Sequence, residues 1–167
     1  TTGNFNTAVG YVSLYSNTIG NNNTAVGTLS LYSNVTGNRN TAFGHNSLFA
    51  NTNGSNNTAM GYQSLNSNSS GISNTAMGYQ SLFSNTGSSN TAFGYSTGTT
   101  ITSGSNLTCI GFDAEPTSGT ITNQITLGNP NVTSLRCNVT TITALSDARD
   151  KKNVAELNLG INFLMKL

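Results

Sequence analysis

The residues best suited to covalent chemistry lie together in the run Ser146–Lys151, Ser-Asp-Ala-Arg-Asp-Lys, in a chain of 167 residues. A serine hydroxyl is a weak nucleophile that needs a base. A lysine amine can serve as that base once desolvation lowers its pKa. The same residues have a simpler interpretation, in which Ser146 is the N-cap of a helix with acidic residues in its first turn. Residue types alone leave both interpretations open.

The rest of the chain offers little other chemistry. From Thr1 to Phe112 the only formally charged side chain is Arg39, and the only histidine is His45. This region has no paired carboxylates and no Ser/His/Asp set, and one histidine is too few for most metal sites. We therefore expect no catalysis from it, no cofactor and no bound metal. Cys109 and Cys137 form no CxxC pair, and the first is predicted to be a buried free thiol.

Composition narrows the classes of partner. Only 7% of the residues are charged and the net charge is +1, so no electrostatic footprint for nucleic acid is present. No signal segment or long apolar span is visible, and we expect no membrane insertion. Most of the charged side chains follow Arg136, which places a boundary near residue 145. The chain begins within a repeat, and we expect it to be a piece of a longer protein.

The elements that must position these residues are repeats of the pentapeptide Asn-Thr-Ala-hydrophobic-Gly. A short, regular period indicates stacked coils of one unit. A second apolar position holds leucine after serine, and each copy is too short for a helical hairpin but alternates like two brief strands. We therefore predict an all-β fold, a parallel β-solenoid (β-roll) of about 17-residue coils. After a one-residue deletion before the last, the copies start at Asn6, Asn23, Asn40, Asn57, Asn74 and Asn90.

Each pentapeptide has two faces, because alternate residues of a strand point to opposite sides. The variable position of Val9 accepts Val, Phe or Met, and we expect it to face the interior of the coil. Ala8 and Gly10 then face outward, which predicts close approach by neighbouring subunits of a parallel oligomer. The alternative is that Ala and Gly fit a tight bend within one coil.

Asparagines and tyrosines also recur at the repeat period. The asparagines are interpreted as turn residues that stack into hydrogen-bonded ladders. The alternative is a polar face for glycan or ice, although no regular Thr-x-Thr ladder is present in the main repeats. For the tyrosines after the glycine, packing is preferred over stacking on sugars. The two sets are Asn17, Asn34, Asn51, Asn68 and Asn85, and Tyr11, Tyr62, Tyr79 and Tyr95.

Asn-Thr-Ala-Val-Gly followed by Ser-Leu resembles the head repeats of trimeric autotransporter adhesins, over residues 3–128. That resemblance implies a left-handed parallel β-roll in a tightly packed trimer. The unit is longer here than in those heads, so the outer turns must differ.

The run Ser146–Lys151 with an apolar helix after it resembles the start of the peptidase S74 family. Its members are intramolecular chaperone domains at the C-terminus of phage tail fibres, tailspikes and endosialidases. The resemblance implies a domain that trimerises, nucleates folding of the stalk and then cuts itself off. By the same resemblance Ser146 and Lys151 form the catalytic dyad. The scissile bond is then Leu145–Ser146, with the bond after Ser146 as the second choice.

Three segments follow from these patterns: a β-solenoid at 1–128, a neck at 129–145, and the start of the chaperone domain at 146–167. The last segment is predicted to contain a short helix, with its N-cap at Asn158. The apolar residues with helical spacing in this segment are Leu157, Ile161, Leu164 and Met165.

The expected function is that of a structural protein in a phage tail fibre, or on the exterior of a phage-like injection apparatus. It forms a rigid homotrimeric rod that attaches to a host-surface receptor, for which a glycan is a candidate, and it matures by autocleavage. Three alternatives stay open. They are a trimeric bacterial surface adhesin, the non-catalytic stalk of a glycan-degrading tailspike, and a monomeric ice-binding solenoid.

Overall fold

The computed structural model describes residues 2–135. The chain divides into two units, Thr1–Thr133 and Ser134–Leu167, and the fold below is that of the first. Only the first part of the predicted neck at 129–145 is described. The predicted helix within 146–167 and the second cysteine, Cys137, lie outside the described residues.

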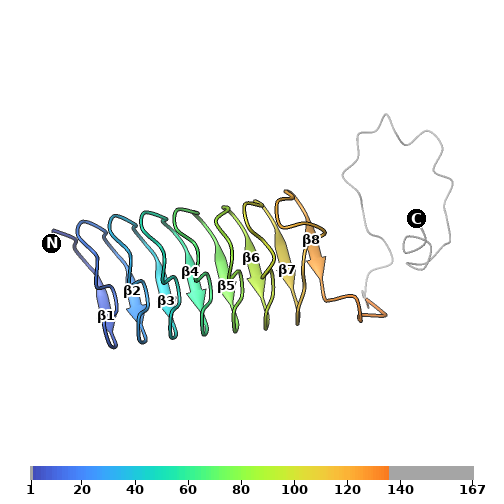
Figure 1. The fold of residues 1–167 in the computed structure, drawn as a ribbon, viewed down its shortest axis with the longest axis horizontal. Coiled ribbons are helices and arrows are strands. Elements are labelled where there is room, and N and C mark those ends of the chain that lie inside the picture. The colour runs from blue at the N-terminus through green and yellow to red at the C-terminus, as the bar shows by residue number, and fades with distance from the viewer. Residues whose placement is uncertain (1, 136–167) are drawn as a thin grey trace. The chain divides into compact units, whose positions relative to one another are not determined.

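The repeats form a parallel β-solenoid with one three-residue strand in each coil (Figure 1). Neighbouring strands pair in register, so Thr24 lies beside both Thr7 and Thr41. The step is 17 residues except between Thr75 and Thr91, where the deletion falls. The predicted solenoid is confirmed. The strands are β1 (Thr7–Val9), β2 (Thr24–Val26), β3 (Thr41–Phe43), β4 (Thr58–Met60), β5 (Thr75–Met77), β6 (Thr91–Phe93), β7 (Thr108–Ile110) and β8 (Ile125–Leu127).

The second strand expected in each coil is replaced by a left-handed turn. In the second coil Leu29 and Leu31 have φ of 58° and 48°, a conformation that costs an L-residue about 1–2 kcal/mol. Hydrogen bonds along the axis offset this cost, because the Leu31 amide donates to the Ser47 carbonyl at 3.0 Å. The turn therefore continues the axial hydrogen bonding without strand geometry, and apolar alternation alone could not distinguish the two.

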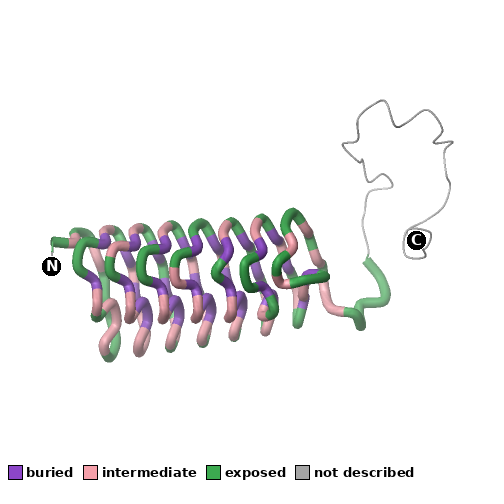
Figure 2. The backbone as a smooth tube through the Cα atoms, turned by 45° about the horizontal axis from the view of Figure 1, so that its top comes forward, coloured by how far each residue is buried: buried purple, intermediate pink, exposed green. Residues whose placement is uncertain are grey.

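The core of the solenoid is narrow, with one buried alanine and one buried leucine in each coil from β2 to β5 (Figure 2). In the coils that follow it consists of Ala92, Ile101, Leu107, Cys109 and Ala114. Ala42 and Leu48 are fully buried, whereas Phe43 between them in sequence is 53% exposed. The prediction that the variable apolar residue faces the interior is therefore wrong, although the leucine position is confirmed. Inside a 17-residue coil the buried leucine leaves room opposite it for only a methyl group, so the strand residue that faces the interior is alanine.

Glycine follows each strand because the next coil of the same chain lies against it. Gly44 has φ of 132°, and a Cβ on it would lie 2.6 Å from the carbonyl oxygen of Gly61. The close approach predicted from a neighbouring subunit is thus made within one chain. Ala and Gly therefore carry no evidence of an oligomer. The alternative of a tight bend within one coil was nearer, but the crowding at glycine comes from the next coil.

Two ladders of asparagine side chains run along the buried interior. In the strand-side ladder Asn57 Oδ1 accepts from the Asn74 amide at 2.9 Å, and Asn57 Nδ2 donates to the Gly71 carbonyl at 2.8 Å. In the turn-side ladder Asn51 Nδ2 donates to Asn34 Oδ1 at 2.7 Å. The predicted turn-side ladder is confirmed from Asn17 to Asn68, and burial excludes it as a polar binding face. The strand-side ladder was not predicted from the sequence. The strand-side ladder is Asn6, Asn23, Asn40, Asn57, Asn74 and Asn90, and the turn-side ladder is Asn17, Asn34, Asn51 and Asn68, with Asn85 bonded to the Gly87 carbonyl instead.

Candidate functional site

The residues expected to carry out autocleavage are not among those that the structure describes. Ser146, Lys151 and the Leu145–Ser146 bond all lie beyond residue 135. The dyad therefore stays a prediction, and the candidate site is built from the surface of the solenoid.

Cys109 has the right chemistry for a nucleophile but the wrong surroundings. It takes the place of the core alanine in β7 and is buried as a free thiol, as predicted. Burial raises the pKa of the Cys109 thiol to about 11, helped by the charge of Glu115 and opposed by a hydrogen bond with Thr126. A thiol with this pKa stays protonated at neutral pH, and only the thiolate is a nucleophile. Cys109 is a small core side chain.

The outward face of the sheet carries a continuous apolar column. In each strand the residue after the core alanine points outward, and in-register pairing places it beside its counterparts, as Phe43 lies beside Val26 and Met60. Phe93 is 55% exposed, close to the value for Phe43. A contiguous exposed apolar surface of this kind marks an interaction site. The apolar column consists of Val9, Val26, Phe43, Met60, Met77, Phe93, Ile110 and Leu127.

A column of threonines runs beside the apolar column on the same face. Each threonine precedes the core alanine or Cys109 and therefore points outward with the apolar residue two positions later. No strand residue is charged, so nothing on the strands opposes close approach by a second uncharged surface. The threonine column consists of Thr7, Thr24, Thr41, Thr58, Thr75, Thr91 and Thr108.

Aromatic rings stack along the rod just after the glycines. Tyr62 and Tyr79 have ring centroids 5.2 Å apart and planes 8° apart, and Tyr79 and Tyr95 are 4.9 Å apart. These separations are typical of favourable aromatic pairs. Each ring covers the face of its neighbour, so the preferred packing interpretation is confirmed for Tyr62, Tyr79 and Tyr95. Tyr11 is exposed and does not belong to this stack. The aromatic stack consists of His45, Tyr62, Tyr79, Tyr95 and Phe112.

A second, shorter stack covers the first coils. Tyr15, Tyr32 and Phe49 follow the core leucine positions, with successive centroids 5.4 Å apart. The two stacks overlap only in the third coil, which contributes both His45 and Phe49. Rings therefore stack along the axis from the first coil to Phe112 at one position or the other.

No family model, curated protein or solved structure matches the chain. Within residues 2–135 there is no helix long and apolar enough to cross a membrane. The same residues contain no group of three or more His, Cys, Asp or Glu side chains that could hold a metal ion. The candidate site is the apolar column with the threonines beside it.

Proposed function

We propose that the chain is part of a homotrimeric fibre in a phage tail or a phage-like injection apparatus, where it forms a rigid rod for attachment to a host surface. The observation that supports association is the apolar column, which extends over all eight strands and is exposed on six of them, all but β2 and β5. In a parallel assembly each column meets identical columns at the same height. This arrangement buries apolar area without unpaired charge.

The resemblances of the sequence support the choice of three chains and of a phage setting. Head-like repeats suggest a trimeric β-roll, and Ser146–Lys151 suggests a chaperone that trimerises a stalk before release. Stiffness suits the role, because every coil is tied to the next by backbone bonds, asparagine ladders and stacked rings. A trimeric surface adhesin and the stalk of a glycan-degrading tailspike remain the alternatives, and hydrolysis of bacterial polysaccharide by the chain would favour the tailspike.

The oligomeric state tests this proposal. Light scattering is expected to give about three chain masses for the wild type, and Phe93→Glu is expected to dissociate the assembly, because it places a charge inside the buried column. The matched control is Ile72→Glu, which changes a side chain of similar exposure, 48%, that is outside the column. It should leave the mass unchanged. A clean monomer for the wild type, or equal dissociation by both variants, would contradict the proposal.

Maturation by autocleavage predicts a second result. In a protein that carries a complete C-terminal domain of this kind, Ser146→Ala is expected to leave a single uncut band on a denaturing gel, because the hydroxyl nucleophile is lost. Lys151→Met should have the same effect through loss of the base. Ser134→Ala, in the same stretch of chain, is the control and should cleave normally. Normal cleavage of the Ser146 variant would exclude the dyad.

A further inference from the structure

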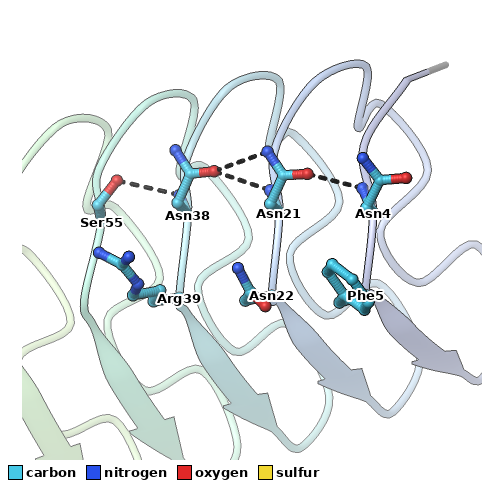
Figure 3. A pocket seen from close by; sticks show the side chains of 7 residues that line it. All are labelled: Asn4, Phe5, Asn21, Asn22, Asn38, Arg39 and Ser55. Carbon is cyan, nitrogen blue, oxygen red and sulfur yellow. Dashed lines mark hydrogen bonds between the residues drawn. The ribbon is translucent and has the colours of Figure 1, made fainter.

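An open groove of about 440 Å³ lies at the corner that leads into the first strands (Figure 3). One row of its lining residues, called the inner row here, consists of Asn4, Asn21, Asn38 and Ser55, which are joined by hydrogen bonds from coil to coil. The backbone N–H of Asn4 donates to Asn21 Oδ1 at 2.7 Å, that of Asn21 to Asn38 Oδ1 at 2.8 Å, and that of Asn38 to Ser55 Oγ at 3.0 Å. The polar groups of the inner row are therefore held in place and are largely hydrogen-bonded within the chain.

The other lining residues form a second row, called the outer row here, which contains side-chain donors that are not hydrogen-bonded within the described part of the chain. Phe5, Asn22 and Arg39 occupy the same position in successive coils, each with left-handed backbone, at φ of 58°, 58° and 55°. All three are exposed and lie in a row next to the inner row (Figure 3). Within the described residues the Asn22 amide and the Arg39 guanidinium donate no side-chain hydrogen bond. An aromatic ring, an amide and a cation thus face one groove.

The charge of Arg39 is unusual in its setting. From Thr1 to Phe112 the sequence has no carboxylate, so no acidic side chain of that stretch competes for the guanidinium. A guanidinium binds carboxylate or phosphate through two parallel hydrogen bonds, and its field extends further where no opposite charge is close.

We propose that this groove binds an anionic saccharide. The acidic group is held by Arg39, a hydroxyl by the Asn22 amide, and the apolar C–H face of a sugar ring by the ring of Phe5. Two coil steps of about 4.8 Å separate Phe5 from Arg39, so the site spans about 10 Å, the scale of a short oligosaccharide. The proposal rests on the attachment role proposed above and names the class of receptor.

The repeat itself supplies conservative variants. Asparagine already occupies the same register and left-handed backbone at Asn22 and Asn56, with φ of 58° and 60°, so Arg39→Asn and Phe5→Asn should fold normally. The control adds Ser89→Arg to Arg39→Asn. It restores the net charge in the same column, three coils from the groove, where the Ser89 backbone has φ of 60°.

The probes are a galacturonic acid trisaccharide, glucose 1-phosphate and a neutral galactose trisaccharide, tested by calorimetry at about 0.15 M salt. The wild type is expected to bind at least one anionic probe and not the neutral one. Arg39→Asn should weaken that binding about ten- to hundredfold, because it removes a charge-assisted pair. The uronate and phosphate arms identify which acidic group the groove takes.

Four results would overturn the groove: no binding of either anion, equal binding of the neutral probe, unchanged affinity in Arg39→Asn, or recovery by Ser89→Arg. Light scattering on the same samples separates the two proposals. A wild-type trimer that binds no anion excludes the groove alone. A wild-type monomer whose anion binding is lost in Arg39→Asn excludes the trimer and keeps the groove.

Discussion

Gly44→Ala is expected to lower the free energy of unfolding by about 2–6 kcal/mol, as measured by urea denaturation followed by circular dichroism. About 1–3 kcal/mol comes from the backbone, since a φ of 132° is rarely adopted by L-residues. About 1–3 kcal/mol more comes from overpacking, since the new Cβ would lie 2.6 Å from the Gly61 carbonyl oxygen. That oxygen belongs to the backbone of the next coil, where the Ser64 backbone amide and hydroxyl donate to it, so it cannot move without weakening these hydrogen bonds.

Two glycines near the ends of the rod distinguish the cost of the steric overlap from the cost of the backbone strain. A Cβ on Gly10 would lie 2.6 Å from the Gly27 carbonyl, whereas one on Gly111 would come no closer than 3.1 Å to the backbone of Gly128. We expect Gly10→Ala to cost more than Gly111→Ala, although both glycines have strongly positive φ. Equal losses at the two ends would show that the next coil yields, and that backbone strain alone explains the glycines.

The sequence was sufficient for the architecture of the solenoid because its period sets the register. Identical residues 17 positions apart must stack, so parallel pairing, the leucine core and the turn-side asparagine ladder could all be predicted. Even the shorter step between Thr75 and Thr91 follows from the deletion. The trimer and the C-terminal helix stay predictions.

The orientation of the strands could not be obtained in the same way. Alternation shows that Ala42 and Phe43 face opposite sides, but it does not show which side is the interior. The larger apolar side chain of Phe43 suggested that it faces the interior. The coil is too narrow for it, and Ala42 faces the interior instead. A signal was present in the sequence: the core position holds Ala in six copies and then Cys109, whereas the outward position accepts Val, Phe, Met, Ile and Leu. In a narrow coil a constant small residue indicates confinement.

The turns and the groove were missed for different reasons. Leucine disfavours left-handed backbone, so no local propensity predicts the φ of 50° at Leu48, which only the stacked neighbours stabilise. The groove depends on one position in three successive coils, and the residue type at that position differs in each of them, so no repeated motif marks it. Arg39, the lone charge in the first 112 residues, was the signal that could have found it.

A substitution in the strand-side ladder is expected to have the second large effect on stability. Asn57→Leu removes the acceptor of the buried Asn74 amide, while the Gly71 carbonyl keeps a bond from Asn68 Nδ2 at 3.0 Å. One lost hydrogen bond and one unpaired buried N–H together cost about 2–4 kcal/mol in the free energy of unfolding. Leucine itself is acceptable at this register, since Leu107 takes it two coils after Asn74 and is also buried.

The matched control is Asn68→Leu in the turn-side ladder. Asn68 is equally buried, but its Oδ1 has no hydrogen-bond partner, because Asn85 Nδ2 donates to Gly87 after the deletion. The substitution removes one unpaired acceptor and creates another at Asn51 Oδ1, with the Gly71 carbonyl still bonded by Asn57. We expect a loss of about 1 kcal/mol or less. A loss as large as that of Asn57→Leu would contradict the assignment of the ladders.

Asn57→Asp tests the direction of the same hydrogen bonds through pH. A carboxylate oxygen in place of Nδ2 faces the Gly71 carbonyl, acceptor against acceptor, and burial disfavours its charge. The folded pKa of the introduced carboxyl is therefore raised above its unfolded value of about 3.9, and the protonated form can donate to Gly71. The deficit in stability is then full above the folded pKa and shrinks as the pH falls through it toward the unfolded value. Urea midpoints measured between about pH 7 and pH 4 should show this recovery of stability for Asn57→Asp relative to Asn57→Leu. A difference between the two variants that does not change with pH would place a different atom opposite the Gly71 carbonyl.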